Sequence, residues 1–389
     1  MHRGGDHVRA VTGHTADMYV LVAPDSFGGT LSAAEAADAI VAGWSAGAPA
    51  DKVDARPLSD GGPGFVDVMH ASLGGELLPM TVPDPLGRPV RALVLRVGST
   101  AYVETAQACG LHHVAPGERD VKAATTYGVG VMLAAAVEAG AREVVVGLGG
   151  SATNDGGAGM YAALGAPPLG ADGLALPYGG AALAACTALG GVPAVRGVGI
   201  VLASDVDNPL LGLHGASAVF GPQKGADRND VLLLDAALGT WAEVLVRDLP
   251  GCPPDLATLP GGGAAGGLGA AFLALGGRRE PGIELVRSAV GLDAALDRAD
   301  LVLTGEGSFD FQSLRGKVAS GVAAAALERG VPCVVLAGQV HLGRREMAAA
   351  GIEAAYSVAE HAGSVDAAVR RPAEGLRALA ERVAREWSR

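Results

Sequence analysis

The chain has 389 residues, which is long for one hydrophobic core, so we expect two domains. Hydrophobic residues make up 49% of the chain and charged ones 18%, which excludes a disordered protein. The net charge is −12, and arginine and lysine are scattered along the chain. This excludes nucleic-acid binding and attachment to a membrane surface, because both need basic stripes.

The four cysteines lie far apart and form no CxxC pair. This favours reduced thiols in the cytoplasm over a disulfide framework or a zinc site. Two uncharged stretches, 173–195 and 259–277, reach transmembrane length, but both are crowded with glycine, so we expect no membrane span. Residues 1–17 are polar and aperiodic, without the pattern of a signal peptide, and we expect a disordered extension there.

The segment after this extension predicts a strand–loop–helix unit. A short apolar run at 19–23 is followed by a polar loop, and Ser32 with Glu35 forms a capping box at the start of a helix. A second strand is expected at 53–58. Loops at the carboxyl ends of parallel strands are where open α/β sheets bind ligands, so both loops are candidate site segments.

The middle of the chain has a different pattern. Hairpin-like strands are expected at 90–97 and 100–105, followed by a helix over 130–139 and a strand at 143–147. Long glycine-rich loops separate these elements from those further on. This change of pattern indicates a second domain.

The last third returns to strands that alternate with helices. Strands are expected at 301–304, 333–337 and 354–358, with a helix over about 317–329 and a long helix at the end. Such alternation predicts a parallel sheet that is covered on both faces. We therefore predict a flavodoxin-like α/β domain made of 18–78 and 278–389, with 79–277 inserted as a second domain.

The glycine-rich loop after the strand at 143–147 is the most informative stretch. Five glycines alternate there with Ser151, Thr153, Asn154 and Asp155. Backbone N–H groups in such a loop can cradle a phosphate, and Asp155 could hold Mg²⁺ or accept a proton. The alternative is a tight structural loop that caps the next helix.

A second glycine-rich stretch at 260–269 contains Gly261, Gly263 and Gly266 in the spacing GxGxxG. No convincing strand precedes it, so it is a weak dinucleotide fingerprint, and an NAD-dependent dehydrogenase is the corresponding alternative function. As a glycine-rich helix N-terminus it can still meet an anion.

Isolated charges at loop positions complete the candidate site. Only four lysines stand against 25 arginines, and Lys224 and Lys317 lie in loops where a compact phosphate ligand is useful; solvated loop lysines are the alternative. Phosphoryl transfer needs carboxylates that hold Mg²⁺ and orient the attacking hydroxyl. The acidic candidates at strand ends are Asp25, Asp60, Asp205, Glu306 and Asp310. These residues alone support an α/β enzyme that binds a phosphorylated ligand.

Seven motifs occur in a fixed order from about residue 18 to the C-terminus. They are Ala23-Pro24-Asp25-Ser26-Phe27, Asp60-Gly61-Gly62, the stretch from Gly149 to Gly157, Asp205-Val206 with Asn208-Pro209-Leu210, the stretch from Phe220 to Ala226, the stretch from Gly263 to Gly267, and Thr304-Gly305-Glu306-Gly307 with Asp310, Gln312 and Gly316-Lys317. In these motifs the chain resembles the type I glycerate kinase family.

The resemblance implies a flavodoxin-like domain and a second domain similar to restriction-endonuclease folds, with the active site in the cleft between them. It also implies ATP and Mg²⁺ as cofactors, D-glycerate as substrate and phosphoglycerate as product, with 2-phosphoglycerate favoured over 3-phosphoglycerate. We expect a monomer or homodimer, without nucleic-acid or membrane partners.

Carried onto these motifs, the resemblance implies three groups of site residues. Catalytic roles fall on Asp60, Asp155, Asp205 and Lys317, of which Asp60 and Asp205 also bind the metal. Nucleotide binding falls on Gly149, Gly150, Ser151, Thr153, Asn154, Lys224, Gly263, Gly266, Gly267 and Glu306. Substrate binding falls on Asp25, Ser26 and Asp310.

Three positions depart from the family pattern. Gly28 stands where a lysine is common, and Pro63 and Val131 stand where a glutamate is usual. The loss of one cation and two carboxylates motivates an alternative function, that of a catalytically impaired member that acts as a sugar-acid or nucleotide-binding sensor.

Overall fold

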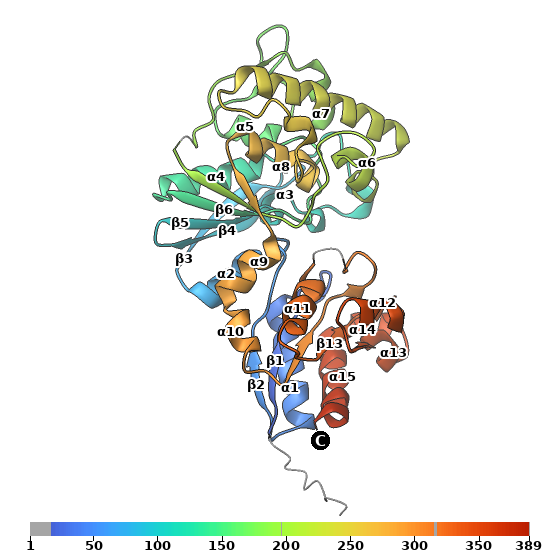
Figure 1. Ribbon diagram of the computed structural model, residues 1–389. Helices are drawn as coiled ribbons and strands as arrows, with labels where there is room; N and C mark the ends of the chain where they lie inside the picture. The colour runs from blue at the N-terminus through green and yellow to red at the C-terminus, as the bar shows by residue number, and fades with distance from the viewer. Residues whose placement is uncertain (1–16, 196, 315–316, 389) are drawn as a thin grey trace, which may run out of the picture.

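The computed structural model describes residues 17–195, 197–314 and 317–388 (Figure 1). Its two main sheets lie one above the other in this view, with the N- and C-terminal segments around the lower sheet and the middle of the chain around the upper one. Of residues 1–17, expected to be a disordered extension, residues 1–16 lie outside the described part. The mixed α/β architecture that we expected is confirmed.

The lower sheet has five strands in the order β15-β13-β11-β1-β2, all parallel. Its central strands are continuous apolar runs that are buried on both faces, as a parallel sheet between helices requires. In chain order the strands are β1 (Tyr19–Val22), β2 (Lys52–Ala55), β11 (Leu301–Thr304), β13 (Cys333–Ala337) and β15 (Ala354–Ser357).

One face of this sheet is covered by α1 (Ala33–Gly47) and α15 (Pro372–Trp387). The expected capping box is present, since Ser32 accepts a hydrogen bond from the Glu35 N–H and Glu35 accepts one from the Ser32 N–H. The two helices pack closely because Gly43 faces the backbone of Arg377, where a Cβ atom would overlap the carbonyl oxygen. Trp44 fills the core beneath them.

The upper sheet has six strands in the order β10-β9-β6-β5-β4-β3. Strands β3, β4 and β5 form the antiparallel meander that the sequence predicted in part, and β5, β6, β9 and β10 are parallel. Their bounds are β3 (Glu76–Pro83), β4 (Pro89–Val97), β5 (Thr100–Glu104), β6 (Glu143–Gly147), β9 (Gly199–Ala203) and β10 (Arg278–Glu280).

A core of large side chains lies on the outer face of the upper sheet, beneath α4 (Tyr127–Glu138), α7 (Arg228–Asp248) and α8 (Ala264–Ala274). In it the rings of Tyr161 and Trp241 meet edge to face with centroids 5.6 Å apart.

The opposite face of the upper sheet packs on α2 (Phe65–Leu73) and α9 (Gly282–Val290). One hydrophobic cluster joins Phe65 and Val286 of these helices to Val145 of the upper sheet and Leu21 of the lower. Because the cluster is shared, α2 and α9 connect the two halves of the molecule at its waist (Figure 1).

The strand pairing differs in detail from the expected segment boundaries at 78/79 and 277/278. The upper sheet includes β3 from Glu76 and β10 up to Glu280. Strand β10 is only three residues long and reads Arg-Arg-Glu, so its sequence carries no apolar alternation.

Shorter elements complete the fold. The helices are α3 (Ala106–Cys109), α5 (Ala158–Ala163), α6 (Ala216–Phe220), α10 (Leu292–Leu296), α11 (Val318–Leu327), α12 (Arg344–Ala349), α13 (Val358–Ala362) and α14 (Val365–Arg370). Two small sheets pair β7 (Pro168–Leu169) with β8 (Ala188–Leu189) and β12 (Ser308–Phe309) with β14 (Gln339–Val340). The 3₁₀ helices are η1 (Leu111–His113), η2 (Pro116–Glu118), η3 (Gly180–Ala185), η4 (Pro222–Lys224) and η5 (Leu256–Thr258).

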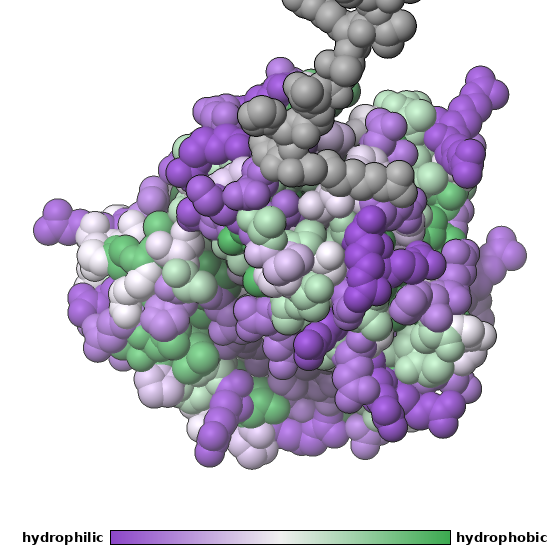
Figure 2. All heavy atoms as spheres, turned by 90° about the horizontal axis from the view of Figure 1, so that it is seen from below, coloured by the Kyte–Doolittle hydropathy of each residue, from purple (hydrophilic) through white to green (hydrophobic). Residues whose placement is uncertain are grey.

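The surface at the lower end of the molecule is mostly hydrophilic, with small hydrophobic groups between the polar side chains (Figure 2). Across residues 17–195, 197–314 and 317–388, no helix combines the length and the apolar character needed to cross a membrane. All four cysteines are free thiols in the structure.

Candidate active site

A cavity of about 440 Å³ lies where loops from the two main sheets meet. It is formed by the loops that follow β1, β2, β6, β9 and β11, so it sits at the carboxyl ends of strands, as expected for an α/β ligand site. The lining residues are Asp25, Ser26, Gly28, Asp60, Gly62, Pro63, Leu148, Gly149, Gly150, Asp205, Val206, Glu306, Gly307, Ser308, Asp310 and Lys317.

All five acidic residues expected at strand ends lie in this cavity, together with Lys317. Among the described lining residues Lys317 is the only cation. The cavity therefore has a strong excess of negative charge, which favours a bound cation.

The pKa values of three carboxyl groups reflect this crowding. Burial and, second, the charge of Asp60 hold the pKa of Asp25 well above its usual range. The same two causes, in the same order, raise the pKa of Asp205 to about 7. Burial raises the pKa of Glu306 to about 7 as well, although the Ser313 hydroxyl and Lys317 oppose the shift. These groups would bind a metal ion or accept a proton readily near neutral pH.

Asp205 is held at the N-terminus of α9. Its Oδ1 accepts a hydrogen bond of 3.0 Å from the Gly282 N–H, and its Oδ2 accepts one of 3.2 Å from the Ile283 N–H. Residue 282 must be glycine, because a Cβ atom there would overlap the Asp60 carbonyl oxygen. Gly282 thus brings the loops of Asp60 and Asp205 together, a role that the sequence analysis missed.

The Asp60-Gly61-Gly62 turn is shaped by close backbone contacts. Asp60 Oδ1 accepts a hydrogen bond of 3.0 Å from the Gly62 N–H. Gly61 has φ +94°, and a Cβ atom there would lie 2.5 Å from the Ala203 carbonyl oxygen. A Cβ atom on Gly149 would lie 2.7 Å from Gly62 Cα. Glycine is therefore required where the two loops meet.

Asp155 does not line the cavity, in contrast to the catalytic role implied for it. It is fully buried and accepts four hydrogen bonds, from the N–H groups of Thr126, Gly157 and Gly159 and from the Thr126 hydroxyl. Burial raises its pKa, and these hydrogen bonds oppose the rise. We infer that Asp155 has a structural role in place of the catalytic one that the resemblance implies, because these hydrogen bonds fix the glycine-rich loop to the start of α4.

Lys224 is also buried outside the cavity lining. Its Nζ donates hydrogen bonds of 2.9 Å to Ser151 Oγ and 2.6 Å to the Thr153 carbonyl, and the neighbouring Asn154 donates to Ser217. Burial lowers the pKa of Lys224 to about 8. Of the loop residues expected at the nucleotide, Gly149 and Gly150 reach the cavity, whereas Ser151, Thr153 and Asn154 face the interior.

The second glycine-rich stretch packs against this loop and does not line the cavity. A Cβ atom on Gly266 would overlap the Thr153 carbonyl, and one on Gly263 would overlap the Pro209 carbonyl. Gly267, with φ +93°, lies against Gly156. The segment before it is the 3₁₀ helix η5 and not a strand, so a dinucleotide fingerprint has no structural support. We infer that these three glycines serve backbone packing in place of the nucleotide binding that the resemblance implies.

Comparison with known proteins assigns the chain to a protein family. The family model described as glycerate kinase family matches residues 20–388. The chain belongs to the glycerate kinase family. It is therefore an enzyme of the kinase class, as the order of its motifs had indicated.

Relatives of this glycerate kinase family member cover nearly its whole length. A glycerate 2-kinase of Escherichia coli strain K12 is 40% identical over 91% of this chain and 93% of its own. An uncharacterized protein of Mycobacterium bovis is 45% identical over 94% of this chain and 91% of its own. The crystal structure of a putative glycerate kinase 2 from Salmonella typhimurium LT2 superposes with a TM-score of 0.77, with 40% identity, and covers 95% of this chain and 98% of that one.

Two of the three departures from the family pattern lie in the cavity wall. Gly28 and Pro63 both line it, whereas Val131 lies on α4 and packs against the core of the upper sheet. Gly316 of the last motif lies outside the described residues, whereas Glu306, Gly307, Asp310 and Lys317 of the same motif line the cavity.

The carboxylate oxygens that line the cavity are ligands of the kind that Mg²⁺ prefers. Within the described ranges no three histidine, cysteine, aspartate or glutamate side chains are grouped so that they could hold a metal ion by themselves. Mg²⁺ usually takes one or two carboxylates and completes its octahedron with water and substrate phosphates. Glu306 Oε1 is buried without a hydrogen-bond partner among the described residues, as expected for an oxygen awaiting a cation or donor.

Proposed function

We propose that the protein transfers the γ-phosphoryl group of Mg·ATP to D-glycerate and favours the 2-hydroxyl. One observation carries the proposal: in a member of the glycerate kinase family, five carboxylates and Lys317 converge in one cavity at the strand ends. The printed activity of the Escherichia coli relative, glycerate 2-kinase, supports the choice of hydroxyl. In this proposal the cavity is the interdomain active-site cleft of a flavodoxin-like and a restriction-endonuclease-like domain.

Asp60 is the side chain that would hold the metal ion. Asp205, whose pKa is raised by the charge of Asp60, lies near it and would face the ion through the attacking hydroxyl. When bound, Mg²⁺ would supply neutralisation of phosphate charge. Lys317 adds the second positive charge to the cavity and would lie against a phosphate oxygen. Asp25, Ser26 and Asp310 are further polar side chains on the lower-sheet side of the cavity and would orient glycerate by its hydroxyl groups.

Asp205 is the group that would accept the proton of the attacking hydroxyl. The N–H groups of Gly282 and Ile283 fix the direction of both carboxylate oxygens. A pKa of about 7 suits a general base at neutral pH, because the base is then ionised yet still binds a proton strongly. We expect kcat to rise with pH as Asp205 ionises and then to level off, with the midpoint at or below about 7, because a metal ion beside the carboxylate favours its ionised form.

The test is a pair of isosteric variants. Asp60→Asn and Asp205→Asn should each lower kcat by about 100-fold or more, because each removes a group that acts on the reacting atoms, while circular dichroism stays unchanged. The matched control is Asp207→Asn, whose side chain is 78% exposed two residues away and should leave kcat unchanged. Full activity in both cavity variants would show that this cavity is not the active site.

The impaired-sensor alternative is separated by binding measurements on the same preparations. A sensor would bind ATP or glycerate and release no ADP at any Mg²⁺ concentration. The proposed kinase releases ADP and phosphoglycerate in equal amounts.

A further inference from the structure

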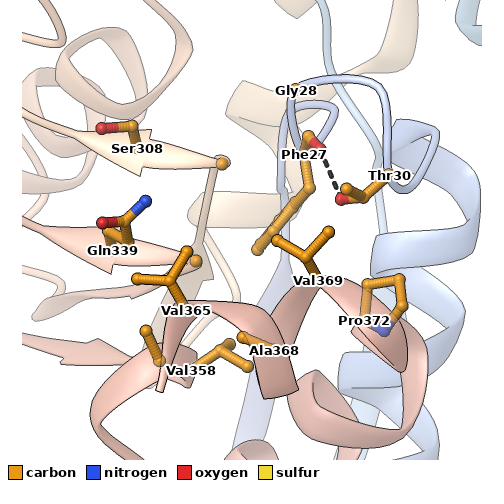
Figure 3. Close-up of a pocket in the computed structure, with 13 residues that line it drawn as sticks. Phe27, Gly28, Thr30, Ser308, Gln339, Val358, Val365, Ala368, Val369 and Pro372 are labelled. Atoms are coloured by element: carbon orange, nitrogen blue, oxygen red, sulfur yellow. Dashed lines mark hydrogen bonds between the residues drawn. The ribbon is translucent and has the colours of Figure 1, made fainter.

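An apolar pocket of about 260 Å³ adjoins the carboxylate cavity on the side of the lower sheet (Figure 3). It is formed by the loop after β1, the small sheet of β12 and β14, and the helices α13 and α14 with the start of α15. Gly28, Gly307 and Ser308 line both the pocket and the cavity. The two hollows therefore meet at these three residues.

The pocket is lined by uncharged and mostly apolar residues, whereas the cavity is lined by many charged ones. The pocket residues are Phe27, Gly28, Thr30, Gly307, Ser308, Gly338, Gln339, Val358, Ala359, Val365, Ala368, Val369 and Pro372, none of them charged. Val365 and Val369 are 43% and 55% exposed. Branched aliphatic side chains that face a hollow gain by contact with an apolar ligand there.

Two polar side chains lie together on one side of this pocket, and Thr30 lies on the other (Figure 3). Ser308 and Gln339 pair in register on β12 and β14, and Figure 3 shows them opposite Phe27 and Val369. The Gln339 amide offers both a donor and an acceptor, which suits the edge of a heterocyclic base. Thr30 contributes less, because its hydroxyl already donates a hydrogen bond of 2.6 Å to the Phe27 carbonyl.

The passage between the two hollows is lined by backbone. A Cβ atom on Gly28 would meet nothing within 4 Å, so a glycine there leaves the opening clear. Gly307 packs against the Gly28 N–H, since a Cβ atom on Gly307 would lie 3.1 Å from that nitrogen. A ribose and a chain of phosphates can cross such a surface without displacing a side chain.

We propose that this pocket holds the purine base of ATP, with the phosphates extending over Gly28 and Gly307 to Lys317. The inference rests on the proposed function for the identity of the ligand. Glycerate does not suit the pocket, because no cation lines it to pair with a carboxylate. A volume below the roughly 300 Å³ of drug-sized sites suits one ring system and not a whole nucleotide.

The test blocks the pocket from its exposed side. Val369→Trp on α14 places an indole in the pocket, and Val219→Trp on α6 is the control, because Val219 is likewise exposed, at 42%, and lines neither hollow. Calorimetry without glycerate measures Kd for Mg·ATP and for inorganic tripolyphosphate, and KM for glycerate is measured separately.

Val369→Trp should raise Kd for Mg·ATP about tenfold or more, with tripolyphosphate binding, KM for glycerate and the melting temperature unchanged. Val219→Trp should change none of these. Wild-type affinity for ATP in a folded Val369→Trp protein overturns the inference, and so does equal weakening of tripolyphosphate, which would place the effect in the cavity.

A second variant tests the polar edge. Gln339→Leu should reduce the preference for ATP over ITP, which differ at the purine 6-position, by about three- to tenfold. An unchanged preference contradicts the assignment of Gln339. If the wild-type protein binds ATP and the pocket variants weaken it but no phosphoglycerate forms, the pocket stands and the proposed function fails. If wild-type protein binds no ATP at millimolar concentration, the pocket assignment fails.

Discussion

Neutralising Asp205 should make the protein more stable as well as inactive, in a way that depends on pH. The folded protein holds the pKa of Asp205 at about 7, against 3.8 for an ordinary aspartate. Between these values the folded state binds more protons at this site than the unfolded state does. Ionisation of Asp205 therefore destabilises the folded protein, and the free energy of unfolding falls as pH rises from about 4 to 7.

The magnitude follows from the size of the pKa shift. Each pKa unit corresponds to about 1.4 kcal/mol, so the stability lost between pH 5 and pH 8 would be about 2–3 kcal/mol for a fully buried group. Asp205 is only partly buried, so screening by water and salt reduces this loss to about 1–2 kcal/mol. The Asp205→Asn variant lacks the titration. The new amide also replaces one of the oxygens that face Gly282 and Ile283, but that cost is the same at both pH values and cancels.

The assay is urea denaturation of wild type and Asp205→Asn at pH 5 and pH 8, with a chelator and without nucleotide. The free energy of unfolding of the variant, relative to wild type, should increase by about 1–2 kcal/mol from pH 5 to pH 8. Asp207→Asn, whose carboxylate is exposed, should show no such change. A difference that is the same at both pH values refutes the idea that Asp60 and burial destabilise ionised Asp205.

Three further predictions separate structural from catalytic residues. Asp155→Asn should lower the free energy of unfolding by about 2–4 kcal/mol in denaturant titrations, yet leave kcat per folded molecule within a few-fold, because four hydrogen bonds to Asp155 hold the loop. Gly266→Ala should lower the free energy of unfolding by at least about 3 kcal/mol in the same titrations, because residue 266 has φ +71° and the added methyl group overlaps Thr153. Its control is Gly276→Ala, which should lower the free energy of unfolding by less than half as much, because residue 276 has φ +84° but no neighbour within 4 Å. Lys317→Met should lower kcat by about 100-fold in a coupled ADP assay with an unchanged melting temperature, and the exposed Lys52→Met is its control; wild-type turnover would exclude Lys317 from the phosphates.

Much of the site was predictable because strand ends are visible in the sequence. Apolar runs mark β1, β9 and β11, and the residue that follows each run must lie at the carboxyl edge of a sheet. That rule places Asp25 and Glu306 at the edge of the lower sheet and Asp205 at the edge of the upper one. A single site between the two edges was implied only by the family resemblance, and the structure places all three residues in one cavity.

The glycine-rich segments were harder, because a glycine that admits a ligand and one that admits another backbone look alike in sequence. Gly149 and Gly266 both stand in such segments, but Gly149 lines the cavity and Gly266 lies against Thr153. Only the neighbours of the missing Cβ atom distinguish the two cases.

Contacts between distant segments also determine whether Lys224 is buried and where the apolar pocket forms. A lysine in a glycine–proline loop is typical of a solvated or ligand-binding group, whereas here the loop folds inward and the ammonium bonds Ser151. The pocket combines the loop at Phe27 with Gln339 and Val369, which lie far from that loop along the chain. No local pattern brings such positions together.

The most direct test of the central claim is to incubate the pure protein with Mg·ATP and D-glycerate and to identify the product by ³¹P and ¹³C NMR against both phosphoglycerates. The proposed function predicts ADP and 2-phosphoglycerate in equal amounts. A 3-phosphoglycerate signal would contradict the choice of hydroxyl, and the absence of any phosphoglycerate while ATP and glycerate both bind would contradict the kinase itself.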